Sequence, residues 1–129
     1  MRLIQFSSQI TNSYADSSIH GEAKWGGINE WGRRLIAEMN RLGIMIDIAY
    51  ATDAAQRQII EASKAPVVDS HVGMRAVCGN PANMPDDILQ ALAVRGGLVG
   101  IPLCANITET STPPAITDLS EGGEEMTSW

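Results

Sequence analysis

The residues of this chain best suited to chemistry are Ser70 and His71, which follow a short apolar run at residues 65–69. Such a run is typical of a buried parallel strand, and α/β folds bind their ligands just beyond the carboxyl ends of these strands. An imidazole at that position can bind zinc through one nitrogen while a neighbouring acceptor orients the other. We therefore predict that His71 is a metal ligand, with a structural or merely polar role as the alternative.

The equivalent position one βα unit earlier is Tyr50, which follows the apolar run at residues 44–48. Tyrosine is a poor ligand for a divalent metal compared with histidine. His20, in the long polar loop at residues 8–27, is a candidate second ligand, and a solvated loop histidine is the competing interpretation. The pattern indicates the frame of a metalloenzyme from which part of the chemistry is missing.

Four aspartates and one arginine also fall near predicted strand ends or helix starts. Asp47 and Asp69 lie inside or at the end of strands, and Asp47 either supports the site as a buried carboxylate or binds a neighbouring backbone group. Asp86 and Asp87 suit the positive end of a helix better than acid–base catalysis. Arg75 is expected at the surface or paired with an aspartate, with neutralisation of a substrate carboxylate as the alternative. The chain has no glycine-rich phosphate loop, Cys–His pair or nucleophilic serine elbow.

Apolar runs and amphipathic stretches alternate along the chain and predict strands and helices in turn. The predicted strands are residues 3–7, 44–48, 66–70 and 98–103, the last interrupted at Pro102. The helix boundary signals are Asn29 and Gly43 for the first helix, Thr52 or Asp53 for the start of the second, and Pro85, in the first turn, with residues 96–97 for the third. In the first helix the predicted core stripe is Trp31, Leu35, Met39 and Leu42. This alternation implies an α/β fold with a parallel sheet and right-handed crossovers.

The length of 129 residues allows one domain and falls short of the roughly 250 residues of a complete eight-stranded α/β barrel. Four strands by themselves leave open whether the sheet is an open one or part of a barrel. We predict one folded domain at residues 1–104. Residues 105–129 form an acidic tail without a basic residue, which we expect to be mostly disordered.

Composition excludes several classes of function. The net charge of −6 and the lack of Lys/Arg clusters argue against nucleic-acid binding. No stretch approaches the roughly 20 apolar residues of a membrane span, and the start of the chain becomes polar too soon for a signal peptide. We therefore expect a cytoplasmic protein. Cys78 and Cys104 follow no zinc or redox spacing and are expected to be buried thiols.

Four strings of residues resemble, in order and spacing, the membrane (renal-type) dipeptidase family over about residues 2–103. The strings are residues 32–48 (GRRLIAEMNRLGIMIDI), 63–71 (SKAPVVDSH), 83–89 (NMPDDIL) and 96–99 (GGLV). The resemblance implies a partial (β/α)8 barrel of the TIM type, with about four of its parallel strands. It also implies dipeptide hydrolysis by two zinc ions that share a bridging carboxylate and activate a water.

Carried over position by position, the resemblance implies an altered site. His71 matches a histidine ligand of the second zinc, and Tyr50 stands where the other histidine ligand of that zinc is expected. Ser8 replaces the histidine that assists the tetrahedral intermediate, and Ala82 replaces the arginine that grips the substrate carboxylate. The family's other metal ligands and its late aspartate have no counterpart within the matched residues.

The expected protein is therefore a segment of a zinc-dependent dipeptidase with a degenerate active site, inactive by itself. Zinc as cofactor and a dipeptide as substrate are expected from the family resemblance alone. One alternative is a non-catalytic half-barrel that binds a partner, a second copy or a missing barrel half, because its sheet edges and apolar surface would be open. Another alternative is a truncated reading frame without a function.

Overall fold

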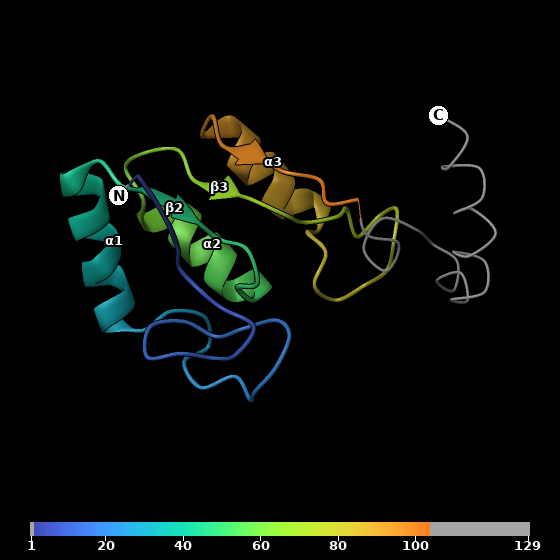
Figure 1. The fold of residues 1–129 in the computed structure, drawn as a ribbon, viewed down its shortest axis with the longest axis horizontal. Coiled ribbons are helices and arrows are strands. Elements are labelled where there is room, and N and C mark those ends of the chain that lie inside the picture. The colour runs from blue at the N-terminus through green and yellow to red at the C-terminus, as the bar shows by residue number, and fades with distance from the viewer. Residues whose placement is uncertain (1, 104–129) are drawn as a thin grey trace, which may run out of the picture.

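The computed structural model describes residues 2–103, in which four parallel strands alternate with three helices (Figure 1). In chain order the elements are β1 (Leu3–Gln5), α1 (Glu30–Leu42), β2 (Met45–Asp47), α2 (Asp53–Ala62), β3 (Val68–Asp69), α3 (Asp86–Val94) and β4 (Leu98–Val99). The strands lie in one sheet in the order β1-β2-β3-β4, and each neighbouring pair is parallel. This confirms the predicted alternation and the parallel sheet. The predicted disordered tail, residues 105–129, lies outside the described residues.

Most helix boundaries follow the signals in the sequence. The side chain of Asn29 accepts the Gly32 N–H at the start of α1, and Gly43 ends that helix in the left-handed conformation, with φ 66°. Thr52 caps α2. Pro85 lies one position earlier than predicted, at the N-cap of α3, because its backbone is extended, with ψ 156°.

The predicted core stripe of α1 is correct at two of its four residues: Met39 is buried and Leu35 packs against the core. Trp31 is 63% exposed and Leu42 is 53% exposed, whereas Ile36, outside the predicted stripe, is buried. The helix is rotated because it approaches the preceding loop closely at Gly32, where a Cβ would lie 2.7 Å from the Tyr14 carbonyl oxygen. An apolar stripe read from the sequence does not count a glycine, so the face that includes Gly32 was missed.

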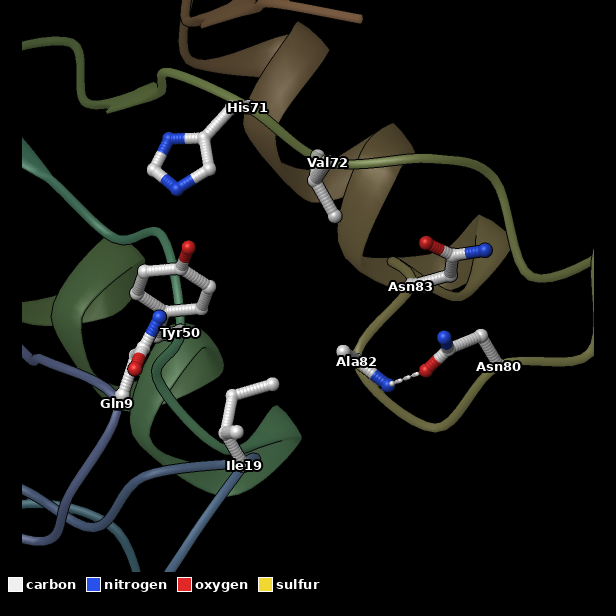
Figure 2. Close-up of a pocket in the computed structure, with 8 residues that line it drawn as sticks. All are labelled: Gln9, Ile19, Tyr50, His71, Val72, Asn80, Ala82 and Asn83. Carbon is white, nitrogen blue, oxygen red and sulfur yellow. Dashed lines mark hydrogen bonds between the residues drawn. The ribbon is translucent and has the colours of Figure 1, made fainter. Parts of the chain in front are cut away.

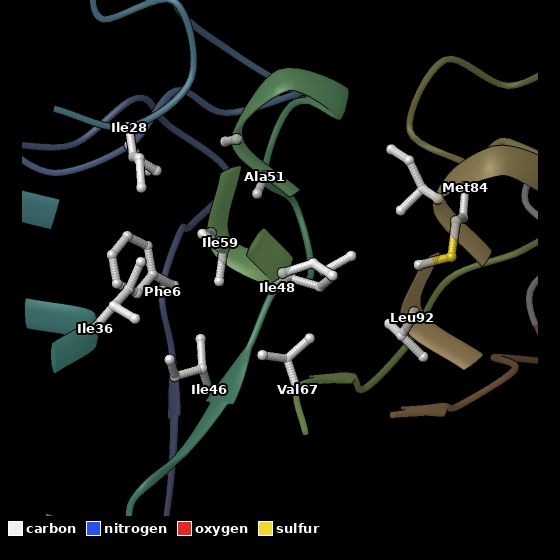
Figure 3. Packing of buried hydrophobic residues seen from close by; sticks show 14 of the residues in the cluster. Phe6, Ile28, Ile36, Ile46, Ile48, Ala51, Ile59, Val67, Met84 and Leu92 are labelled. Atoms are coloured by element: carbon white, nitrogen blue, oxygen red, sulfur yellow. The ribbon is translucent and has the colours of Figure 1, made fainter. Parts of the chain in front are cut away.

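The hydrophobic core lies between the helices and one face of the sheet (Figure 3). Phe6 and Ile46 contribute from the first two strands and their ends, and Ile36 and Ile59 contribute from α1 and α2. In the described part of the chain, no helix has the length and apolar character needed to cross a membrane.

Gly100 ties the end of β4 to the end of β3. Its N–H donates to the Asp69 carbonyl at 2.8 Å, and its carbonyl accepts the Val72 N–H at 2.9 Å. A Cβ at Gly100 would overlap the carbonyl oxygen of Ser70. The replacement Gly100→Ala must therefore push the two strands apart.

We expect Gly100→Ala to lower the free energy of unfolding by about 2–3 kcal/mol, measured from the urea midpoint. Gly79→Ala is the matched control, because a Cβ there meets nothing within 4 Å, and it should change stability by less than about 0.5 kcal/mol. Equal midpoints for the two variants would contradict this account of the strand junction.

Candidate functional site

A cavity of about 210 Å³ lies beyond the carboxyl ends of β2 and β3 (Figure 2). Its lining residues are Gln9, Ile19, Tyr50, His71, Val72, Asn80, Ala82 and Asn83. Three positions singled out from the sequence therefore lie around the same cavity. His71 is the predicted metal ligand, Tyr50 stands in place of a second histidine ligand, and Ala82 stands in place of the arginine that binds the substrate carboxylate. The position is the one at which parallel α/β folds bind ligands.

Tyr50 is held in the cavity by an unusual backbone. Its φ is 65°, a left-handed conformation that is uncommon for residues other than glycine. The backbone N–H and the hydroxyl of Ser18 both donate to the Tyr50 carbonyl, at 2.8 and 3.2 Å. The phenol ring meets the His71 imidazole edge-on, with ring centroids 4.8 Å apart and an interplanar angle of 81°.

His71 is oriented by its neighbour in the chain and by the strand ends. Its Nδ1 lies 2.7 Å from the Ser70 hydroxyl oxygen. The Asp47 carboxylate accepts the Ser70 N–H at 3.1 Å, which holds the end of β3 against the end of β2. Asp47 also accepts the Ala49 N–H, so it binds backbone groups and, through Ser70, supports the position of His71. Figure 2 shows the imidazole and the Tyr50 phenol pointing toward each other.

The side chains of residues 2–103 do not by themselves fit a zinc centre. Nowhere among them do three or more His, Cys, Asp or Glu residues lie in an arrangement that could hold a metal ion. Protein zinc sites use at least three such ligands. His71 meets a phenol in the cavity, and His20 is exposed in its loop and does not line the cavity.

Asp69 is fully buried on the helix side of the sheet, next to the cavity wall. Burial, reinforced by the charge of Asp47, raises its pKa to about 7, although the His71 backbone N–H opposes the shift. One carboxylate oxygen accepts the Gln56 amide at 3.4 Å. The other oxygen and the Gln56 carbonyl oxygen have no hydrogen-bond partner. Both orphan atoms are acceptors, and a proton on Asp69 would turn its carboxyl group into a donor.

Arg75 is paired with an aspartate, as predicted. Its two terminal nitrogens bind the Asp53 carboxylate at 2.7 and 2.8 Å, and one of them also donates to the Pro81 carbonyl. Asp53 raises the pKa of Arg75 through these hydrogen bonds. The guanidinium is therefore engaged outside the cavity and does not take the place of the arginine missing at Ala82.

Asp86 and Asp87 lie in the first turn of α3, where the sequence placed them. Asp87 also binds Arg57 at 2.7 Å, which holds the pKa of this exposed carboxylate below its usual value. Ser8 is exposed and does not line the cavity. Cys78 is a buried thiol, as expected, and Cys104 lies outside the described residues.

The loop at residues 8–27 is built around Asp16, which the sequence analysis did not single out. The carboxylate is buried and accepts the backbone N–H groups of Lys24, Trp25 and Gly27, at 2.7, 3.0 and 2.8 Å. Burial is the largest single influence and raises the pKa of Asp16, but the backbone donors together hold it below its usual value. This organisation brings Gln9 and Ile19 to the cavity. An aspartate in a loop that ends in the glycine pair at residues 26–27 is the signal that was available.

Asn80 and Asn83 were also missed as cavity residues. The Asn83 side chain is buried, donates to the Cys78 carbonyl at 2.9 Å and accepts the Gly73 N–H at 3.2 Å. It therefore shapes the turn between β3 and α3. Its place in the NMPDDIL string was a usable signal, because a buried asparagine before a helix start commonly binds the backbone.

A parallel sheet followed by helices, with a cavity at the carboxyl ends of its strands, is the arrangement of a segment of a TIM-type α/β barrel. Residues 1–122 match the family model described as membrane dipeptidase (peptidase family M19). Dipeptidase 3 of Macaca fascicularis is 38% identical over 113 residues, which are 84% of this chain and 23% of that protein. The chain belongs to the membrane dipeptidase family, whose members are metallopeptidases.

Solved structures agree with this assignment. The probable dipeptidase PvdM of Pseudomonas aeruginosa superposes with a TM-score of 0.74 and 29% identity, over 78% of this chain and 26% of that one. A metallopeptidase of Rhodobacter sphaeroides, liganded with a phosphinate mimic of the dipeptide L-Ala-D-Ala, superposes with a TM-score of 0.78. At 22% identity, over 98% of this chain and 38% of that one, the second likeness shows the fold alone. The chain spans about a quarter of the length of its curated relatives.

Proposed function

We propose that this chain is a dipeptidase-family barrel segment whose cavity has lost zinc-dependent hydrolysis and does not cleave dipeptides by itself. The observation that carries the proposal is the contact between Tyr50 and His71 at the mouths of β2 and β3, with ring centroids 4.8 Å apart. By family resemblance these two positions hold the two histidine ligands of one zinc ion. Here a phenol meets the remaining imidazole.

Ala82 supports the same conclusion from the substrate side. It lines the cavity at the position where the family resemblance places the arginine that binds the substrate carboxylate. A charge-assisted hydrogen bond of this kind contributes roughly 1.5–3 kcal/mol. Arg75 does not compensate, because its terminal nitrogens bind Asp53 and Pro81. A dipeptide would enter the described cavity without a cation to hold its carboxylate.

The test restores the missing imidazole with Tyr50→His and uses Tyr50→Phe as the matched control. Histidine is among the side chains enriched at positive φ, so the φ of 65° at this position should accept it. We expect Tyr50→His to bind zinc at least about tenfold more tightly than the unchanged chain, since it supplies a further nitrogen ligand. Tyr50→Phe should not change zinc affinity. Competition with a chromogenic chelator measures both.

The second part of the test measures dipeptide hydrolysis with added zinc. The competing function is zinc-dependent hydrolysis in which residues outside the described range supply the missing metal ligands. We expect the unchanged chain to release no free amino acid above the rate of a zinc-only blank. Turnover that depends on zinc and disappears in His71→Ala would overturn the proposal.

A further inference from the structure

The register of the strands shows that the described helices cover only one face of the sheet. Residues paired across neighbouring strands share a face, and so do residues two apart along a strand. Ile4, Ile46, Asp69 and Val99 therefore share the face that packs against the helices, and all four are buried or packed on the core. The three helices follow right-handed crossovers, which place them all on this face.

The opposite face of the sheet exposes three apolar side chains, although Asp47 on the same face is buried. The residues on it are Leu3, Gln5, Met45, Asp47, Val68 and Leu98. Leu3 is 40% exposed, Met45 is 47% exposed and Leu98 is 68% exposed. In a closed barrel this face is the interior, where such side chains stack in layers away from water.

No described strand covers either edge of the sheet, because within residues 2–103 β1 pairs only with β2 and β4 pairs only with β3. A neighbour that closes both edges must offer parallel strands, with helices on the outer face, at each of its own edges. A second copy of this chain meets these conditions. Two copies related by a two-fold axis place the β4 edge of each against the β1 edge of the other, and the four strands that residues 2–103 form in each copy make the eight of a TIM-type barrel.

We infer that the 129-residue chain by itself pairs with a second copy to close an eight-stranded barrel. The superposition on complete barrels, with TM-scores of 0.74 and 0.78, supports it, because the half-sheet already has their curvature. The exposed apolar side chains of Leu3, Met45 and Leu98 would contribute to the ~800 Å² that a stable interface buries on each partner. The inference does not depend on whether the cavity is catalytic.

Cysteine cross-linking tests this arrangement specifically. Within one copy, β1 and β4 are separated by three strand spacings, about 14 Å, which is beyond the reach of a disulfide. Within one copy Gln5 and Leu98 occupy the same level of the sheet, through Asp47 and Val68. Closing eight strands with the shear of 8 that TIM-type barrels have shifts the register by about four residues at each junction, so Gln5 of one copy lies level with Pro102 of the other. In a Cys104→Ser background, a mixture of Gln5→Cys and Pro102→Cys chains should therefore form a covalent pair on oxidation, while each variant alone should not.

Sedimentation equilibrium gives the second measurement, with an expected mass of twice 13.8 kDa. Leu98→Asp should raise the dissociation constant at least about 100-fold, because it places a charge at both strand junctions. Val77→Asp is the matched control, since Val77 is 55% exposed in a loop away from the sheet, and it should leave the mass unchanged. A monomer at all concentrations, open-ended larger assemblies, or cross-links in a single-cysteine variant would overturn the inference.

Discussion

Asp16→Asn is expected to lower the free energy of unfolding by about 3–5 kcal/mol, a large part of the 5–15 kcal/mol that typically stabilises a domain. Both carboxylate oxygens of Asp16 accept backbone N–H groups: Oδ1 binds Lys24, Oδ2 binds Gly27, and Trp25 contacts both. An asparagine keeps one acceptor and turns a donor toward the other N–H groups. Hydrogen bonds to a charged acceptor contribute roughly 1.5–3 kcal/mol each, and a buried N–H left unpaired adds a further cost.

The pH dependence separates this effect from a general loss of packing. Because the pKa of Asp16 is lowered in the folded chain, its contribution is present above the unfolded-state value of about 3.9 and is lost as the pH falls through the folded value. The stability difference between Asp16→Asn and the unchanged chain should therefore shrink below about pH 4. Urea unfolding between pH 3 and 8 measures it, with Asp86→Asn, an exposed aspartate at the start of α3, as the control. A difference that is constant with pH would show that the charge of Asp16 is not what organises the loop.

Asp69→Asn is expected to raise the free energy of unfolding, in contrast to Asp16→Asn, by about 2–4 kcal/mol above pH 7. The pKa of Asp69 is raised to about 7 by burial and by Asp47. Between about pH 4 and 7 the unfolded chain has released this proton and the folded chain has kept it, so stability falls as the pH rises through that window. A shift of this size corresponds to about 4 kcal/mol.

Asparagine removes this penalty and suits the local hydrogen bonding. Its amide places a donor where one oxygen of Asp69 and the Gln56 carbonyl oxygen are both without partners, while its carbonyl can still accept the Gln56 amide. We therefore expect the unfolding free energies of the two chains to be close at pH 4 and to diverge toward pH 8. Asp86→Asn, which removes an exposed carboxylate at the start of α3, should not show this divergence between pH 5 and 8. Parallel curves for Asp69→Asn and the unchanged chain would show that Asp69 does not carry the raised pKa.

Much of the fold could be predicted because the signals are local. Asn29 and Gly43 bound α1 through a side-chain cap and a left-handed residue, which are short-range effects. Continuous apolar runs alternating with helices indicate a parallel sheet covered by helices. What failed was the face of α1, because Gly32 allows a close approach to Tyr14 that no count of apolar residues contains.

The candidate site could be predicted where it follows strands and not where it depends on a loop. Tyr50 and His71 come directly after strands, and parallel strands bring their carboxyl ends together. Gln9 and Ile19 reach the same cavity only because Asp16 folds the loop between them and α1. The path of a long loop depends on such non-local hydrogen bonds, which residue types and spacing do not reveal.

The most direct test of the central claim is the zinc content of the purified 129-residue chain after incubation with zinc and dialysis against zinc-free buffer. With a phenol facing the imidazole at 4.8 Å between ring centroids, we predict far less than one zinc ion per chain and the same small value in His71→Ala. Two tightly held zinc ions per chain, lost when His71 is replaced, would contradict the account.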